Sequence, residues 1–202
     1  MKKVVLLGDS CRLWGYGPRV PELLGDKYEV FQPDDNCRFS KYTLRMLFDL
    51  NDSIKDADVI HWNNGHWDCT EIFDDGLFTT EEEYIENMTR IAKLLLKITP
   101  NVIFSTTTPV REEFEWTHND KIQRFNEIIV PRLKEMGVKI NDLYSVVAED
   151  INGNVKEFDN IHLSDKGIEL CAQSVAQAIK QFDQLAHSAL IILNQNKKEK
   201  EK

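Results

Sequence analysis

The sequence predicts an α/β fold in which helices cover both faces of a parallel sheet of about five strands. Three observations predict it. Short apolar runs bounded by turn residues, such as residues 3–7, are typical of strands buried in a parallel sheet. Longer segments whose apolar residues repeat three and four positions apart, clearest over residues 80–98, are typical of amphipathic helices. The two kinds of segment alternate along the chain, as in sheets built with helical crossovers.

Five apolar runs are expected to form the strands. They cover residues 3–7, 28–31, 58–62, 102–106 and 138–140. Polar clusters follow three of these runs, at residues 8–10, 63–64 and 106–109. Because the carboxyl ends of parallel strands share one edge of the sheet, we expect the three clusters to meet there.

Four longer segments are expected to be helices. They cover residues 42–54, 80–98, 119–136 and the chain after residue 164. Thr80 and Glu83 have the spacing of a capping box at the start of the second helix. Pro131 should kink or split the third helix, and Gly137 should end it. Ser164 should cap the last one.

The length and composition of the chain bound its organisation and its partners. A chain of 202 residues is long enough for one domain with a hydrophobic core. We expect this domain over residues 1–193 and a polar, disordered tail over residues 194–202. The formal net charge of −9 argues against nucleic acid or an anionic membrane surface as a partner, because both require clustered Lys and Arg.

The cysteines and the N-terminal residues predict a cytoplasmic protein. The apolar run near the N-terminus, residues 4–7, is too short for the apolar part of a signal peptide, and no run is long enough to span a membrane. Cys11, Cys37, Cys69 and Cys171 form no CxxC pair, so we expect free thiols rather than a zinc site.

Ser10 is a candidate nucleophile. It stands in Gly8-Asp9-Ser10, directly after the first predicted strand. A serine hydroxyl becomes nucleophilic when a base accepts its proton, and a serine that opens a helix lies near backbone N–H groups that favour an anion. The alternative is that Ser10 is an ordinary helix N-cap.

Asp159 and His162 are candidates for the orienting acid and the base. The two residues are three positions apart, in a loop just before the last predicted helix. This spacing allows the carboxylate to lie beside one imidazole nitrogen and leaves the other nitrogen free to serve Ser10. The alternative is a surface aspartate and a half-buried histidine that flank a helix start.

The two motifs together resemble the first and last sequence blocks of the SGNH (GDSL-like) hydrolase superfamily. Gly8-Asp9-Ser10 matches the first block, and Asp159-x-x-His162-Leu-Ser-x-x-Gly167 matches the last, over nearly the whole chain. The resemblance implies a flavodoxin-like, three-layer α/β/α sandwich. It also implies ester hydrolysis through an acyl-enzyme on Ser10, without a metal or organic cofactor.

The resemblance further implies an oxyanion hole, made by the serine backbone N–H, a glycine N–H from a second block and an asparagine side chain from a third. In Asn36-Cys37-Arg38-Phe39-Ser40-Lys41, Lys41 takes the place of the family glycine. We expect the backbone N–H of Lys41 to donate there, provided that the local backbone does not require a positive φ.

The third block departs from the family pattern. If Gly65 takes the place of the family glycine, Trp67 occupies the usual asparagine position, so Asn63 or Asn64 must supply the amide. The string from Asn63 to Trp67 is similar to the Asn-x-Gly-His-Trp of plant and fungal polysaccharide O-acetyl-esterases and acetyltransferases, which favours Asn63. The alternative for the paired asparagines is a simple turn.

Several further residues are candidates for a substrate pocket. His66, Trp67 and Trp62 are suited to line an acyl or sugar site, although tryptophan is more often part of a core. Asp9 lies beside the nucleophile, where we expect it to hold the local backbone. The acidic segment 112–116 is either a loop that covers the site or a solvated loop.

These residues predict a hydrolase of a small acyl ester, with an acetyl group on a carbohydrate as the favoured substrate because of the His-Trp resemblance. The expected partner is therefore a small-molecule or carbohydrate ester. An O-acyltransferase with the same triad is one alternative, and a ligand-binding domain without catalysis is another. The sequence does not specify the oligomeric state.

Overall fold

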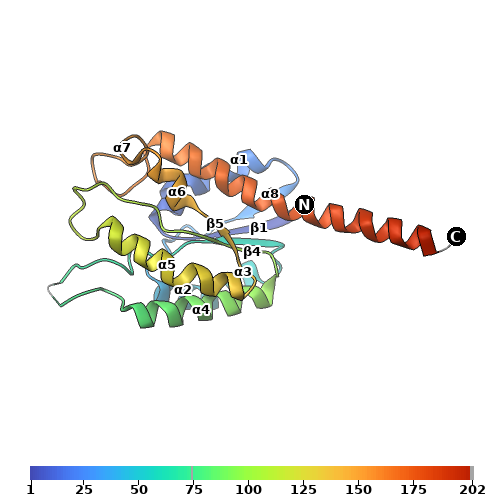
Figure 1. Ribbon diagram of the computed structural model, residues 1–202, viewed down its shortest axis with the longest axis horizontal. Coiled ribbons are helices and arrows are strands. Elements are labelled where there is room, and N and C mark those ends of the chain that lie inside the picture. Colours follow the sequence, from blue (N-terminus) through green and yellow to red (C-terminus); the bar gives the residue numbers. More distant parts are fainter. Residues whose placement is uncertain (74, 201–202) are drawn as a thin grey trace.

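A five-stranded sheet lies at the centre of the computed structural model, which describes residues 1–73 and 75–200 (Figure 1). The strands are β1 (Lys2–Leu7), β2 (Tyr28–Phe31), β3 (Val59–Trp62), β4 (Val102–Ser105) and β5 (Lys139–Asn141). Neighbouring strands pair in parallel throughout, in the order β2-β1-β3-β4-β5. The predicted parallel sheet of five strands is confirmed.

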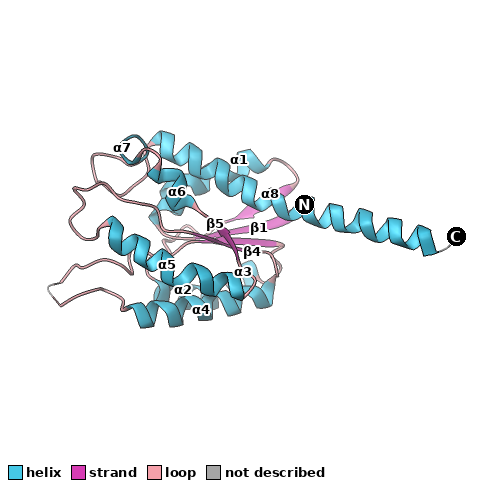
Figure 2. Ribbon diagram, viewed as in Figure 1, coloured by secondary structure: helices cyan, strands magenta, loops and turns pink. Residues whose placement is uncertain are grey.

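Helices cover both faces of this sheet (Figure 2). One face packs against α2 (Ser40–Asp49), α4 (Glu81–Ile98) and α5 (Asn119–Glu135). The other face packs against α1 (Val20–Leu24), α6 (Leu143–Ala148) and α8 (Asp165–Lys200). Short segments complete the order: η1 (Cys11–Tyr16), η2 (Gly17–Arg19), α3 (Asn51–Ile54) and α7 (Ile151–Asn154). The predicted three-layer α/β/α sandwich is confirmed.

Each strand contributes side chains to both hydrophobic clusters, because successive side chains of a strand point to opposite faces. In β1, Val5 and Leu7 pack in the α4 layer, while Val4 and Leu6 pack in the α8 layer. All four are buried. This explains why strand β1 is apolar at every position from Val4 onward rather than at alternate positions.

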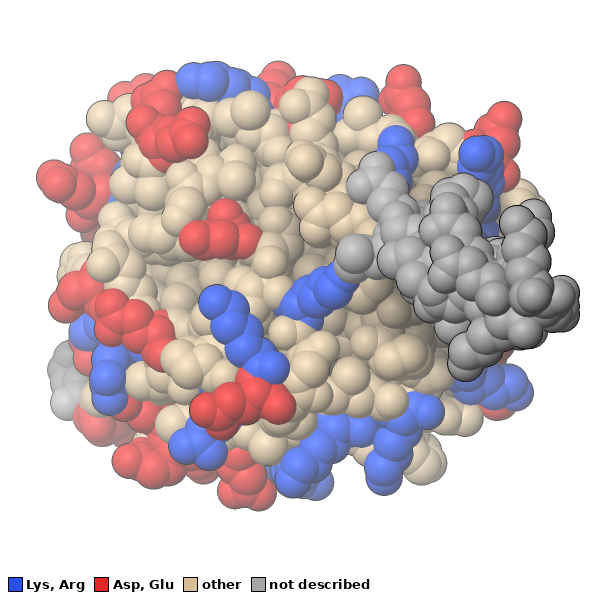
Figure 3. Space-filling model, turned by 45° about the vertical axis from the view of Figure 1, so that its right-hand side comes forward, with Lys and Arg blue, Asp and Glu red and all other residues tan. Residues whose placement is uncertain are grey.

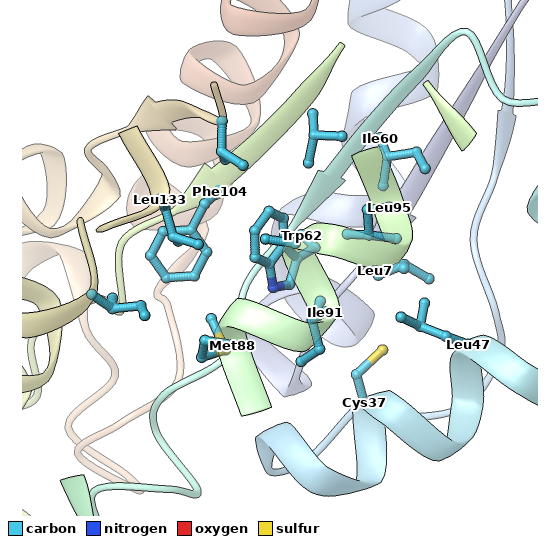
Figure 4. Packing of buried hydrophobic residues seen from close by; sticks show 14 of the residues in the cluster. Leu7, Cys37, Leu47, Ile60, Trp62, Met88, Ile91, Leu95, Phe104 and Leu133 are labelled. Atoms are coloured by element: carbon cyan, nitrogen blue, oxygen red, sulfur yellow. The ribbon is translucent and has the colours of Figure 1, made fainter. Parts of the chain in front are cut away.

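Trp62, at the end of β3, belongs to the core and not to a substrate pocket. Its side chain is fully buried, and its ring lies 5.0 Å from that of Phe104. Met88 and Ile91 of α4 surround it from the helix side (Figure 4). The suggestion that Trp62 lines the substrate pocket is therefore wrong.

The predicted helix signals are largely confirmed. Thr80 accepts a hydrogen bond from the Glu83 N–H, and the Glu83 side chain accepts one from the Thr80 N–H, which completes the capping box of α4. Helix α5 continues through Pro131 without being divided. Gly137, with φ of 91°, follows its end. The predicted helix 42–54 is instead two helices, α2 and α3, separated at Leu50.

Helix α8 begins as predicted, with the Ser164 Oγ accepting a hydrogen bond from the Gly167 N–H at 3.1 Å. The helix extends beyond the sandwich to Lys200 (Figure 1). The division into a domain over residues 1–193 and a tail over residues 194–202 stays a prediction, and residues 201–202 lie outside the described residues.

Two surface properties bear on possible partners. Across the described part of the chain, no helix is both long enough and apolar enough to cross a bilayer. On the face of the molecule shown in Figure 3, Lys and Arg side chains are interspersed with Asp and Glu side chains.

Candidate active site

The three polar clusters meet at the carboxyl edge of the sheet, as predicted. The N–H of Asn63, after β3, donates to the Leu7 carbonyl at the end of β1, at 3.2 Å. The Thr107 hydroxyl, after β4, donates to the Asn64 carbonyl at 3.1 Å. Thr108 Oγ1 lies 3.9 Å from Cys11 Sγ. The loops after β1, β3 and β4 therefore form one contact network.

Ser10 occupies the N-cap position of η1, but its side chain makes no capping hydrogen bond. Asp9 makes the hydrogen bonds at the start of η1 instead. Its Oδ1 accepts from the Cys11 N–H at 2.9 Å, and its carbonyl accepts from the N–H groups of Arg12 and Leu13. The Ser10 side chain is almost buried, at 9% exposure. Its hydroxyl is thus not committed to the helix start.

Buried Arg12 holds the turn that carries Ser10 against the second block. Its guanidinium is fully buried and donates to the carbonyls of Gly8, Pro33 and Asp35, at 3.1, 2.7 and 2.7 Å. Gly8 also exchanges hydrogen bonds with Cys37, to which its N–H donates at 3.1 Å and from whose N–H its carbonyl accepts at 3.0 Å. No local pattern in the sequence marks Arg12, because two of the carbonyls that it binds lie 21 and 23 residues away.

Asp159 and His162 form the hydrogen bond that their spacing predicts. His162 Nδ1 lies 2.9 Å from Asp159 Oδ2. Asp159 Oδ1 accepts from the N–H groups of Ile161 and His162, at 3.2 and 2.9 Å. Burial raises the pKa of Asp159, but the hydrogen bonds from His162 and Ile161 outweigh it, so the pKa lies below its ordinary value.

The free nitrogen of His162 belongs to the same hollow as Ser10. Among the residues that the structure describes, Nε2 of His162 has no hydrogen-bond partner. Ser10 and His162 both line a pocket of about 450 Å³ and a smaller one of about 210 Å³ beside it. The ring of Trp14, 5.9 Å from the His162 ring, packs over the imidazole. An ionised Asp159 accepts a hydrogen bond from the Nδ1–H of His162, which leaves Nε2 as the nitrogen without a proton in the neutral ring.

The two candidate asparagines differ in what their amides bind. Both ends of the Asn64 amide are occupied: Oδ1 accepts from the Thr43 hydroxyl at 3.0 Å, and Nδ2 donates to the Arg38 carbonyl at 2.9 Å. In Asn63, Oδ1 accepts from the Tyr16 hydroxyl at 2.9 Å, so Nδ2 is the atom left to donate to a ligand. This geometry favours Asn63.

Gly8 is required beside Asn63. A Cβ at this position would lie 1.9 Å from Asn63 Oδ1, which is closer than any real contact. The absence of a side chain at Gly8 therefore allows the Asn63 amide to pack directly against the turn that carries Ser10.

Lys41 lies in the first turn of α2, and its side chain is exposed. Its backbone is helical, so replacing the family glycine by lysine needs no positive φ; the positive φ of the second block, 49°, is at Arg38. Buried Asp68 holds this helix end, accepting from the N–H and the hydroxyl of Ser40 at 2.9 and 2.6 Å. Burial raises the pKa of Asp68 to about 6.

The larger pocket contains His66 and Trp67, as expected, together with many residues that the sequence analysis did not select. Its lining consists of Ser10, Trp14, Asn36, His66, Trp67, Thr70, Ile72, Phe78, Phe114, Trp116, Asp159, Ile161 and His162. Phe114 and Trp116 come from the acidic segment 112–116, which therefore borders the site. Asp9 is fully buried and lies outside this lining.

His66 is held by a neighbouring loop. Its Nε2 lies 3.0 Å from Thr108 Oγ1, and the side chain is almost buried, at 3% exposure. Burial lowers the pKa of His66, although the nearby carboxylate of Asp9 acts in the opposite direction. A neutral His66 ring therefore lines the pocket, and among the described residues its side chain makes one polar contact, from Nε2 to Thr108.

Solved structures share this fold, whereas no protein-family model and no curated protein sequence matches the chain. A lipase/acylhydrolase from Enterococcus faecalis has a TM-score of 0.72 at 19% identity, over 90% of this chain and 96% of that one. The acetyl xylan esterase AlAXEase has a TM-score of 0.71 at 20% identity, over 88% and 99%. A GDSL-like lipase from Bacteroides thetaiotaomicron has a TM-score of 0.68 at 22% identity, over 89% and 88%.

These likenesses establish the fold. Each covers nearly nine-tenths or more of both chains, at identities of 22% or lower. The chain therefore has the α/β/α fold of the GDSL-like lipases and esterases, which is the fold that the first and last sequence blocks predict. A shared fold does not fix the activity, which depends on the residues of the site.

The Asp159–His162 hydrogen bond predicts a titration. In the folded chain the Asp159 carboxyl should titrate below about 3.9, the value of an unperturbed aspartate. Its contribution to stability is then present above this pH and is lost as the pH falls through the folded pKa. In His162→Ala the pKa of Asp159 should rise, because the hydrogen bond from the imidazole is lost. Carboxyl ¹³C NMR measures this midpoint.

Asp150 provides the control for this titration. The hydrogen bond from the Lys166 side chain lowers the pKa of Asp150, and His162 takes no part in it. The Asp150 midpoint should therefore be the same in wild type and in His162→Ala. An Asp159 midpoint that does not move in His162→Ala contradicts the hydrogen bond.

Proposed function

We propose that this protein is a serine ester hydrolase that acts through an acyl-enzyme. Ser10 is the nucleophile, His162 the general base and acid, and Asp159 the residue that orients it. One observation carries the proposal: His162 is held by Asp159 at 2.9 Å through Nδ1, while its Nε2 finds no partner in the described part of the chain and His162 shares a pocket with Ser10. The uncommitted Ser10 hydroxyl supports the same assignment.

In the first half of the reaction, Ser10 Oγ attacks the ester carbonyl carbon and its proton passes to His162 Nε2. Asp159 stabilises the imidazolium that results. The tetrahedral intermediate then collapses as the bond to the alcohol oxygen breaks. That oxygen takes the proton from Nε2 and leaves as the alcohol, and the acyl group stays on Ser10.

In the second half, water replaces the alcohol. Nε2 of His162 accepts a proton from the water as it attacks the acyl carbon, and the bond between that carbon and Ser10 Oγ breaks. Oγ takes the proton back, and the free acid leaves. An O-acyltransferase uses the same steps with a sugar hydroxyl in place of water, so analysis of the products separates the two activities.

We assign the oxyanion hole to three donors: the backbone N–H of Ser10, Nδ2 of Asn63 and the backbone N–H of Lys41. The free end of the Asn63 amide supports the second donor, and the helical backbone at Lys41 supports the third. Each such donor is worth roughly 3 to 4 kcal/mol in the transition state. Arg12 and Asp68 hold the segments that carry these donors.

The finer substrate suggested by the sequence is an acetyl group on a carbohydrate. The His66-Trp67 resemblance supports it, and the solved structure of AlAXEase, which has the same fold, is described as an acetyl xylan esterase. The aromatic side chains that line the pocket beside Ser10 favour a longer acyl group instead. We also propose a cytoplasmic location, since all four cysteines are buried and unpaired, as is typical of reducing compartments.

Removing either reacting group should abolish hydrolysis without unfolding the protein. Ser10→Ala and His162→Ala should each lower kcat/KM for a 4-nitrophenyl ester on the order of 10⁴-fold, and the double variant should be no slower, because the two residues act as a unit. Ser53→Ala, on α3, is the control and should keep wild-type activity. Full activity in Ser10→Ala would falsify the proposal.

Substitution of Asn63 should affect catalysis, whereas substitution of Asn64 should affect stability. Asn63→Ala should lower kcat about 10²- to 10³-fold, because it removes an oxyanion donor. Asn64→Ala should mainly lower the free energy of unfolding, by about 1–3 kcal/mol, because it removes the amide that donates to the Arg38 carbonyl. The Thr43 hydroxyl keeps the Cys37 carbonyl as its acceptor. Steady-state kinetics and urea unfolding of both variants measure this. A larger loss of kcat in folded Asn64→Ala would reverse the assignment.

A further inference from the structure

We propose that the larger pocket beside Ser10 binds a bulky apolar acyl group, so that the substrate is an ester of a medium-chain acid rather than of acetic acid. The inference rests on the proposed function, because it takes Ser10 as the residue that is acylated. It is carried by the walls of the pocket, by their exposure and by the position of His162.

The walls of the pocket are formed by large apolar side chains. Trp67 and Ile72 follow β3, Phe78 precedes α4, and Phe114 and Trp116 lie between β4 and α5. The rings of Phe114 and Trp116 meet edge to face at 5.7 Å. Two loops, one between β3 and α4 and one between β4 and α5, thus contribute apolar surface to one hollow of about 450 Å³.

Much of this apolar surface is open to solvent. Phe114 is nearly buried, at 8% exposure, whereas Phe78, Trp67 and Trp116 are 39%, 41% and 55% exposed. Apolar surface gathered in a hollow favours a ligand that removes it from water. An acetyl group carries a single methyl and covers little of these walls, whereas a longer acyl chain reaches several of them.

The position of His162 indicates which part of the ester enters the larger pocket. The alcohol oxygen takes its proton from His162 Nε2, so the alcohol leaves on the His162 side. The smaller hollow lies there, and Gly15, Lys156 and Leu163 help to line it. His162 also lines the larger pocket, but that pocket extends beyond it to His66 and Trp67 of the third block, the block that carries the proposed oxyanion donor Asn63. We place the acyl group there.

The polar groups of the larger pocket are poorly suited to a sugar. A bound sugar needs partners for its hydroxyl groups. The Thr70 hydroxyl donates to the Trp67 carbonyl at 2.9 Å, and His66 Nε2 is engaged with Thr108. Nδ1 of His66 has no partner among the described residues, but this atom is buried and so presents little polar surface to a ligand. Apolar contact is then the main attraction that the walls offer, which favours a hydrocarbon group over a carbohydrate.

A series of 4-nitrophenyl esters with acetyl, butanoyl, hexanoyl and octanoyl groups tests the proposal, because only the acyl group changes. Burial of one methylene group is worth roughly fourfold in an equilibrium constant. We expect kcat/KM to rise along the series, with octanoyl at least tenfold above acetyl. A flat or falling series would overturn the acyl proposal and would leave ester hydrolysis itself intact.

If no ester is hydrolysed, that result counts against the proposed function alone. The binding of carboxylic acids to the Ser10→Ala variant then still tests the pocket proposal. Octanoate should bind this variant at least tenfold more tightly than acetate. The fluorescence of the pocket tryptophans measures the two affinities. Equal affinities of octanoate and acetate would overturn the proposal.

Single variants locate the effect in the pocket. Trp116→Ala should lower the octanoyl-to-acetyl ratio of kcat/KM at least fivefold, since it removes a wall. Phe48→Ala is the matched control: Phe48 lies on α2, is 74% exposed and does not line the pocket, so the wild-type ratio should remain. An unchanged ratio in Trp116→Ala, or an equal loss in Phe48→Ala, would contradict the proposal.

Discussion

The parallel pairing of β1 between β2 and β3 is the constraint on which the site depends. Parallel strands end at the same edge, so every loop that follows a strand carries its residues to one place. Ser10 follows β1, Asn63 follows β3, and the threonines at 106–108 follow β4. The pairing of the backbones alone therefore makes neighbours of residues that are more than 50 positions apart in the sequence, such as Ser10 and Asn63.

Two buried charged residues refine this arrangement. Arg12 binds three carbonyls and joins the Ser10 turn to the chain after β2. Asp68 binds the first N–H of α2 and joins the third block to the second. Breaking the hydrogen bonds of a buried charge costs free energy, so the bonds that Arg12 and Asp68 make hold their loops in place. Such rigidity is what an oxyanion hole requires, because its donors act by being in place before charge develops.

Much of the fold was predictable because its signals are local. The helix at 80–98 carries its capping box and its apolar stripe within its own sequence. The segment 11–24 was not assigned, because its turns are short and interrupted by glycine and proline, and tertiary bonds of Arg12 hold them. Segment 143–154 forms two short helices that lack a clear periodicity.

The same division holds in the site. The pairing of Asp159 with His162 follows from a spacing of three residues and was predicted. The choice between Asn63 and Asn64 was not determined by the sequence, because Thr43 and Arg38, which engage Asn64, lie more than 20 residues away. The aromatic walls were largely missed for a related reason: Phe78 and Trp116 lie in loops, where no periodicity marks the buried side.

Covalent labelling tests the central assignment most directly. A phosphonate that mimics the tetrahedral intermediate should form one adduct per chain, and peptide mapping by mass spectrometry should place it on Ser10. The reaction should be strongly slowed in His162→Ala, because the hydroxyl then lacks its base. If the folded wild-type protein forms no adduct, or forms it on another serine while Ser10 stays unmodified, Ser10 is not an activated nucleophile and the account is contradicted.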